Sequence, residues 1–164
     1  MTSLPDLSLV ILIGAGATAV MDLWLAGLAR LGIASLNFDF VGRWVGHLFR
    51  GRFRHAAIGR SPPIRGERLL GWLTHYLVGI VFATGLVLTQ GLAWVHDPHL
   101  GPALAAGVLT VLAPLGLMQP AMGLGLAASR TATPLRNCLR SLANHTVFGL
   151  GLYLAALAVQ PLAG

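Results

Sequence analysis

Five side chains that can titrate or form strong hydrogen bonds lie within long apolar stretches of this sequence: Asp22, His75, Gln119, Asn144 and His145. Ionisable groups in apolar surroundings are costly, so they face inward, pair with one another and mark ion or proton pathways. Histidine titrates near neutral pH and can exchange a proton with a nearby carboxylate. Two histidines flanked by small residues can also supply the axial ligands of a haem. We expect one of three roles: helix–helix hydrogen bonding alone, a proton or small-ion pathway, or haem binding through His75 and His145.

The composition indicates that the elements which position these residues are transmembrane helices. Only 10% of the residues are Asp, Glu, Lys or Arg and the mean hydropathy is +0.75, whereas soluble domains carry about 25% charged residues. A transmembrane helix needs roughly 20 mostly apolar residues. Four such stretches occur, at about 7–31, 69–94, 100–128 and 139–159. We therefore predict an all-α integral membrane protein with four transmembrane helices in a bundle, forming a single domain over residues 1–164.

The arginines predict the orientation of these helices. Eight of the eleven lie at or between the first and second spans, and the other three lie at or between the third and fourth. The N-terminus, the turn between the second and third spans and the C-terminus carry none. Because cytoplasmic loops carry an excess of Lys and Arg, we expect both Arg-rich regions in the cytoplasm and both termini on the outer side.

The longer Arg-rich loop, 32–68, contains one amphipathic segment. Apolar residues recur at helical spacing from Phe38 to Phe49, while Arg43 and His47 take the other side, and Asn37 can cap the start. Such a segment predicts a helix that lies in the cytoplasmic interface with its apolar face buried. The basic side chains expected to face anionic lipid headgroups are Arg43, Arg50, Arg52 and Arg54. Since topology accounts for this charge, we expect the bilayer and not a nucleic acid as the partner.

An internal repeat relates the second and fourth spans at an offset of 70 residues. The residues that this offset pairs are Gly71 with Ser141, His75 with His145, Gly79 with Gly149 and Ala83 with Tyr153. A weaker alignment of the first and third spans, at an offset of 97, pairs Asp22 with Gln119. The chain therefore resembles a parallel two-helix repeat. Depth in the membrane can be counted from the arginine that flanks each span. By this count Asp22, His75, Gln119 and His145 lie about 8 to 16 Å along their helices, which predicts one polar layer.

No motif in the sequence indicates an enzyme. A P-loop, an H-E-x-x-H pair and a serine nucleophile elbow are all missing from the sequence. The stretch from Gly14 to Ala19 has the spacing of a dinucleotide-binding turn, but no helix with a wet face follows, so we interpret its glycines as helix-packing positions. The turn from His96 to His99 is interpreted as solvated rather than metal-binding. We expect no enzymatic activity, no metal and no cofactor other than the haem considered above.

Several motifs spread over nearly the whole chain resemble those of a bacterial inner-membrane family known only as a domain of unknown function. These motifs are Val41-Gly42-Arg43-Trp44-x-Gly46-His47, Gly51-Arg-Phe-Arg-His55, Gly66-Glu67, Gly71-Trp72-x-x-His75-Tyr76, Met118-Gln119-Pro120-x-Met122-Gly123 and Phe148-Gly-Leu-Gly-Leu-Tyr153. The resemblance implies a small multi-pass protein of the bacterial inner membrane. Together with the orientation predicted from the arginines, we expect its termini in the periplasm. No activity comes with the resemblance, so it assigns no catalytic residue. It leaves open a homo-oligomer or a protein partner.

Overall fold

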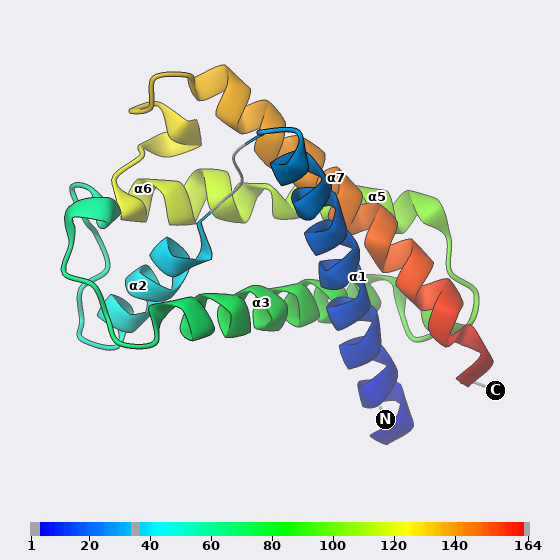
Figure 1. Ribbon diagram of the computed structural model, residues 1–164. Coiled ribbons are helices and arrows are strands. Elements are labelled where there is room, and N and C mark those ends of the chain that lie inside the picture. Colours follow the sequence, from blue (N-terminus) through cyan, green and yellow to red (C-terminus); the bar gives the residue numbers. More distant parts are fainter. Residues whose placement is uncertain (1–3, 34–36, 163–164) are drawn as a thin grey trace. The chain divides into compact units, whose positions relative to one another are not determined.

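The structure, a computed structural model, describes residues 4–33 and 37–162, and every regular element within these two ranges is a helix (Figure 1). Four helical segments are long and apolar enough to cross a membrane: Asp6–Arg30, Glu67–Gln90, Leu100–Met122 and Pro134–Val159. The prediction of an all-α membrane protein with four transmembrane helices is therefore confirmed. Within the predicted Arg-rich loop, residues 34–36 lie outside the described residues.

The boundaries of the helices follow glycine and proline more closely than hydropathy. The helices of the four spans are α1 (Leu4–Arg30), α3 (Glu67–Gln90), α5 (Leu100–Thr110), which begins the third span, and α7 (Pro134–Val159). The shorter ones are α2 (Phe38–Leu48), α4 (Ala93–His96) and α6 (Gln119–Met122), with 3-10 turns at Ile58–Arg60, Leu126–Ala128 and Gln160–Leu162. The second and third spans end earlier than predicted, because Gly91 and Gly123 adopt positive φ angles of 82° and 94° directly after them. The fourth span begins earlier, at Pro134, since proline suits the first turn of a helix.

The third span contains an irregular turn. Between α5 and α6, residues Pro114–Met118 form a π-helical turn, and a second proline, Pro120, follows in α6. Proline has no backbone N–H and removes a hydrogen bond from the helical ladder. The two prolines thus account for an irregular turn in the third span, a geometry that occurs frequently at functional sites.

The chain forms two compact units. Unit 1 comprises Met1–Ala34, Tyr76–Thr110 and Asn144–Gly164, and unit 2 comprises Ser35–His75 and Val111–Ala143. The second, third and fourth spans each contribute residues to both units. We describe each unit by itself.

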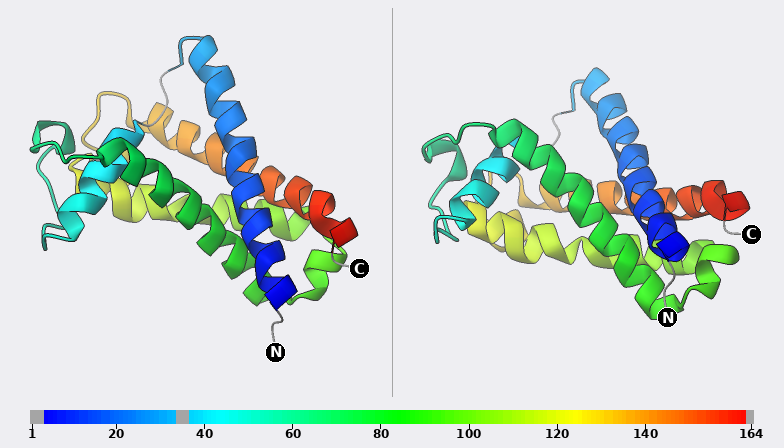
Figure 2. Two further views of the ribbon diagram at one scale, coloured as in Figure 1. Left: turned by 60° about the horizontal axis from the view of Figure 1, so that its bottom comes forward. Right: turned by 90° about the horizontal axis from the view of Figure 1, so that it is seen from below.

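Unit 1 is held together by close contacts of small residues. A Cβ atom added at Gly14 of α1 would lie 2.5 Å from the Cα atom of Ile80 in α3, and Gly16 packs against Ala155 of α7. Both views in Figure 2 show α1 crossing the C-terminal part of α7, where Gly151 packs against Ala17. Helices in lipid associate through such close backbone approach. The interpretation of the glycines of α1 as packing positions is therefore confirmed.

The glycine contacts also support the internal repeat of the second and fourth spans. Gly79 of α3 packs against Thr18 Oγ1 and Gly14 O of α1, and Gly149 of α7 packs against Gly107 and Ala103 O of α5. The two glycines that the offset of 70 residues pairs thus make equivalent contacts with the preceding span. For the first and third spans, these contacts pair Gly14 with Gly107, one helical turn away from the predicted offset of 97.

Unit 2 is built around α2 and the first turns of α3. Asn37 caps α2 as predicted, because its side-chain oxygen accepts a 2.9 Å hydrogen bond from Asp39 N. α2 then lies directly on α3, since a Cβ atom at Gly42 would meet Glu67 O and one at Gly71 would meet Phe38 O. A small apolar core joins α2 to the end of the third span and consists of Val41, Ile58 and Met122, with Phe38, Phe40, Trp44 and Met118 packed against it.

Candidate functional site

Three of the predicted polar-layer residues belong to unit 1, and each forms a hydrogen bond to another helix. Tyr76 Oη donates to Asp22 Oδ2 over 2.9 Å, joining α3 to α1. The indole of Trp24 in α1 donates to Asn144 Oδ1 in α7 over 3.0 Å. His145 in α7 bonds to Thr110 of α5, as described next. The hydrogen-bonding partners Tyr76, Trp24 and Thr110 were missed, because a Trp, Tyr or Thr in a span is typical of ordinary membrane helices.

The hydrogen bonds of His145 determine which ring nitrogen carries the proton. Thr110 Oγ1 donates to Gly107 O over 2.6 Å, which uses its only hydrogen. Thr110 Oγ1 and His145 Nδ1 lie 2.8 Å apart, so the ring must donate from Nδ1. In the neutral ring, the basic lone pair is then on Nε2.

The other two predicted polar-layer residues belong to unit 2. The ring of His75 lies 4.5 Å from the ring of Phe38 and 6.0 Å from that of Trp72, measured between centroids. Gln119 is buried in α6, and its Oε1 atom has no hydrogen-bond partner among the described residues. The single polar layer of five residues stays a prediction, as does haem binding by His75 and His145.

Arg43 corrects one prediction for the Arg-rich loop. Its side chain does not face headgroups but binds Glu67 with two hydrogen bonds, from Nε to Oε2 over 2.9 Å and from Nη2 to Oε1 over 2.7 Å. The two side chains are only 12% and 16% exposed. Arg43 Nη1 also donates to the Ser61 carbonyl over 3.2 Å. The hydrogen bond with Glu67 raises the pKa of the Arg43 guanidinium above its usual range, so Arg43 stays charged. Its charged side chain therefore connects α2 to α3 inside unit 2.

His47, expected on the polar face of the amphipathic helix, is also buried. Its Nδ1 atom lies 2.7 Å from His55 Nε2, and the two rings stack with centroids 4.9 Å apart. His47 Nε2 lies 3.1 Å from the Pro62 carbonyl, which can only accept, so this nitrogen carries the proton. In the neutral pair His55 therefore donates from Nε2, and its buried Nδ1 has no partner among the described residues.

Burial lowers the pKa of the His55 imidazole, and the neighbouring charges of His47 and Arg52 lower it further. A proton on Nδ1 would have no acceptor there, so the geometry and the lowered pKa agree on a neutral His55 at pH 7. The backbone N–H of His55 donates to Ala121 O over 2.8 Å, which fixes this segment against α6. The His47–His55 pair is thus a structural connection between α2 and the loop that follows it.

The loop after α2 leaves its other arginines at the surface. Arg50, Arg52 and Arg54 are exposed, as expected for side chains that face headgroups. Phe49 and Phe53 alternate with them and are 83% and 65% exposed. The loop thus presents aromatic and cationic side chains together, a combination typical of segments that lie in a membrane interface.

Metal ligation has no support in the part of the chain that the structure describes. No group of three or more His, Cys, Asp or Glu residues there could hold a metal ion. In the turn after α4, His99 Nδ1 bonds to the Asp97 carbonyl over 2.7 Å, and His99 Nε2 lies 3.8 Å from the Asp97 carboxylate. Both side chains are more than half exposed, at 65% and 85%.

One protein-family model matches most of the chain. The family described as Protein of unknown function (DUF2938) matches residues 11–159 of the chain. The chain belongs to the DUF2938 family. The matched DUF2938 region contains the first span from residue 11 onward, the other three spans, α2 and every polar pair described above. It confirms the resemblance to an uncharacterised family. No curated protein and no solved structure matches the chain.

Proposed function

We propose that this DUF2938 protein is a non-enzymatic protein of the bacterial inner membrane whose intramembrane titratable residues, Asp22 and His145, pass protons. The proposal rests on one observation: two titratable groups each bind a hydroxyl group of a neighbouring helix, Asp22 that of Tyr76 and His145 that of Thr110. A hydroxyl group both donates and accepts hydrogen bonds. The Tyr76 hydroxyl can therefore pass a proton to or from Asp22, and the Thr110 hydroxyl can do so for His145 once its own hydrogen leaves the Gly107 carbonyl.

A purely structural role would not require residues that titrate. The hydrogen bond between Trp24 and Asn144 in the same unit shows that an indole and an amide can join α1 to α7 without any charge. Hydrogen bonds between membrane helices contribute about 0.6 to 2 kcal/mol whether or not the partners titrate. A carboxylic acid inside a span is more costly than an amide. The use of Asp22 and His145 instead of amides therefore favours proton exchange.

The proposal includes an orientation, with the Arg-rich loops in the cytoplasm and both termini in the periplasm. We expect alkaline phosphatase fused after Asp97 or at the C-terminus to be active, because this enzyme folds only in the periplasm. The same reporter inserted after Arg60, in the longer Arg-rich loop, should be inactive. An inactive reporter at the C-terminus, or an active one after Arg60, would contradict the orientation.

Replacing Asp22 by asparagine should abolish proton movement with little change in packing. The amide of Asp22→Asn can still accept the hydrogen bond from Tyr76 but cannot bind a proton. The protein would be reconstituted into liposomes that contain a pH-sensitive dye, and a potassium diffusion potential would drive proton entry. We expect the wild-type chain to move protons at least about tenfold faster than the Asp22→Asn variant.

The matched control is Asn144→Leu, which removes the hydrogen bond from Trp24 but changes no titratable group. We expect it to retain the wild-type rate of proton entry. Wild-type liposomes that take up protons no faster than protein-free liposomes would refute the proposal. An Asp22→Asn variant as fast as the wild type would do the same, and the polar pairs would then serve only to pack helices.

A further inference from the structure

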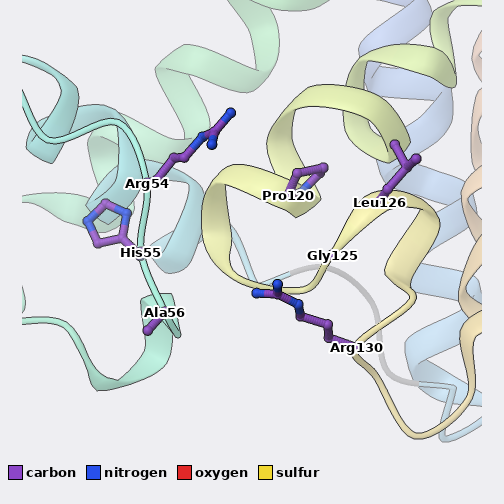
Figure 3. A pocket seen from close by; sticks show the side chains of 7 residues that line it. All are labelled: Arg54, His55, Ala56, Pro120, Gly125, Leu126 and Arg130. Atoms are coloured by element: carbon purple, nitrogen blue, oxygen red, sulfur yellow. The ribbon is translucent and has the colours of Figure 1, made fainter.

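A pocket of about 440 Å³ lies within unit 2, where the third span ends. Its walls come from three segments: the loop after α2, α6, and the turn between α6 and α7. The residues that line it are Arg54, His55, Ala56, Pro120, Gly125, Leu126 and Arg130. In Figure 3 the side chains of Arg54 and Arg130 lie on the side of the backbone of residues 54–56 that faces Pro120. The ring of His55 points away from them, to the opposite side of that backbone.

The charge of this pocket is positive and is not neutralised by the residues that the structure describes. Unit 2 contains ten of the eleven arginines but only two acids, Asp39 and Glu67. Glu67 is already bound to Arg43. Within residues 4–33 and 37–162, the exposed side chains of Arg54 and Arg130 form no ion pair or hydrogen bond. Two guanidinium groups that line one pocket give it a charge that suits an anion, and their planar forks suit a phosphate group.

The backbone holds the walls of the pocket in place. His55 N donates to Ala121 O, and Gly123 packs directly on the Ala56 carbonyl, so the loop after α2 is fixed to the end of α6. Arg130 N donates to Leu124 O over 2.9 Å, which turns the chain back toward the pocket. The pocket therefore exists before any ligand binds, which lowers the entropic cost of binding.

The turn that carries Arg130 is also strained. Ala127 and Ala128 have φ angles of 49° and 59°, in the left-handed region that costs a residue other than glycine about 1 to 3 kcal/mol. Hydrogen bonds hold this conformation, because the Cys138 thiol donates to Ala127 O and Thr131 Oγ1 donates to Ala128 O. Such strain persists only where the surroundings impose it and is common at ligand sites.

Apolar side chains beside the pocket indicate what carries the anion. Leu126 lines the pocket and is 67% exposed, and Phe53, adjacent to Arg54 in the chain, is 65% exposed. Pro120 lies within the third candidate span, whereas Arg130 lies beyond its end at Met122. The pocket is therefore at the level where headgroups meet acyl chains. A soluble phosphate compound would have no use for the exposed leucine and phenylalanine.

We infer that this pocket binds the phosphate group of an anionic phospholipid, with Arg54 and Arg130 on the phosphate and Leu126 against the start of an acyl chain. The inference is independent of the proposed proton pathway, which uses residues of unit 1. It assigns to Arg54 and Arg130 a specific site, distinct from a general attraction of all surface arginines to the bilayer.

The test measures thermal stabilisation of the purified full chain in an uncharged detergent as phosphatidylglycerol is added, since a bound ligand raises the melting temperature. We expect Arg54→Gln and Arg130→Gln each to raise the lipid concentration for half-maximal stabilisation by about tenfold. The matched control Arg65→Gln removes an equal charge from an exposed arginine of unit 2 outside the pocket. It should shift that concentration by less than about twofold.

Three comparisons can overturn the inference. Equal losses for all three variants would mean that surface charge alone attracts the lipid. Equal stabilisation by phosphatidylcholine would exclude an anionic ligand. Stabilisation by soluble glycerol phosphate in the absence of lipid would assign the pocket to a soluble phosphate compound and refute the lipid. Counting bound phosphatidylglycerol by native mass spectrometry gives a second measurement that does not depend on how each variant melts.

Discussion

Replacing Gly71 by alanine is expected to separate α2 from α3 and destabilise unit 2 by about 3 kcal/mol. An added Cβ atom would meet the backbone carbonyl of Phe38 and would lie 3.2 Å from Gly42 N. The obstacle is backbone rather than a flexible side chain, so one of the two helices must shift. Such a shift would also pull Arg43 away from Glu67, the pair that connects the same two helices.

The matched control lies in the same helix. Gly85 of α3 has nothing within 4 Å of an added Cβ atom, so Gly85→Ala should be neutral or slightly stabilising, because alanine is the better helix former by about 1 kcal/mol. The measurement is thermal unfolding in detergent, followed by tryptophan fluorescence. Equal melting temperatures for the Gly71→Ala and Gly85→Ala variants would show that the contact between α2 and α3 is not required.

The sequence predicts the spans well because lipid imposes a simple rule. Every backbone polar group in the bilayer must be satisfied within a helix, so length and hydropathy identify spans without knowledge of tertiary contacts. The ends of spans depend instead on local conformation. Leu92 and Leu126 are as apolar as any residue within a helix, yet they lie beyond the glycines with positive φ that end α3 and α6.

The amphipathic pattern of α2 predicts the helix and part of its buried face, since Val41 is buried and Phe38 and Trp44 pack against the same core, but it misses the glycines and His47 on that face. Hydrophobic periodicity is measured on apolar side chains such as those of Val45 and Leu48. The closest contacts of α2 are made instead through Gly42 and Gly46, which have no side chain and so do not contribute to that periodicity. Burial of that glycine face also buries the adjacent His47. The glycine spacing was visible in the sequence, but that α2 packs on α3 could not be inferred from it.

The sequence predicts the depth of the polar residues in the membrane but not the direction in which each side chain points. Depth along each helix follows from residue counting, so Asp22 and His145 were found. Rotation about the helix axis does not follow from depth, and neighbouring residues point about 100° apart. The sequence thus singles out Asp22 and His75, but it could not predict the hydrogen bond that Asp22 accepts from Tyr76, the residue after His75.

Replacing Arg43 by methionine is expected to destabilise the protein by about 3 kcal/mol, because it leaves the Glu67 carboxylate without its cation. Only 16% of that side chain is exposed, so water cannot fully replace the two lost hydrogen bonds. The Ser61 carbonyl would also lose its donor. Arg43→Lys should not restore stability, since an ammonium group cannot form the same two-pronged contact.

A double-mutant cycle separates this pair from general effects of charge. Glu67→Gln alone leaves the guanidinium without a carboxylate, and we expect Arg43→Met combined with Glu67→Gln to cost about 2 kcal/mol less than the sum of the single changes. The control is Arg50→Met, which removes an exposed arginine just beyond α2 and should change the free energy of unfolding by less than about 0.5 kcal/mol. Additive single changes, or an equal loss for Arg50→Met, would contradict a specific pair. Coupling near 2 kcal/mol would instead mean that Arg43 of α2 stabilises the fold through Glu67, the single acid of α3.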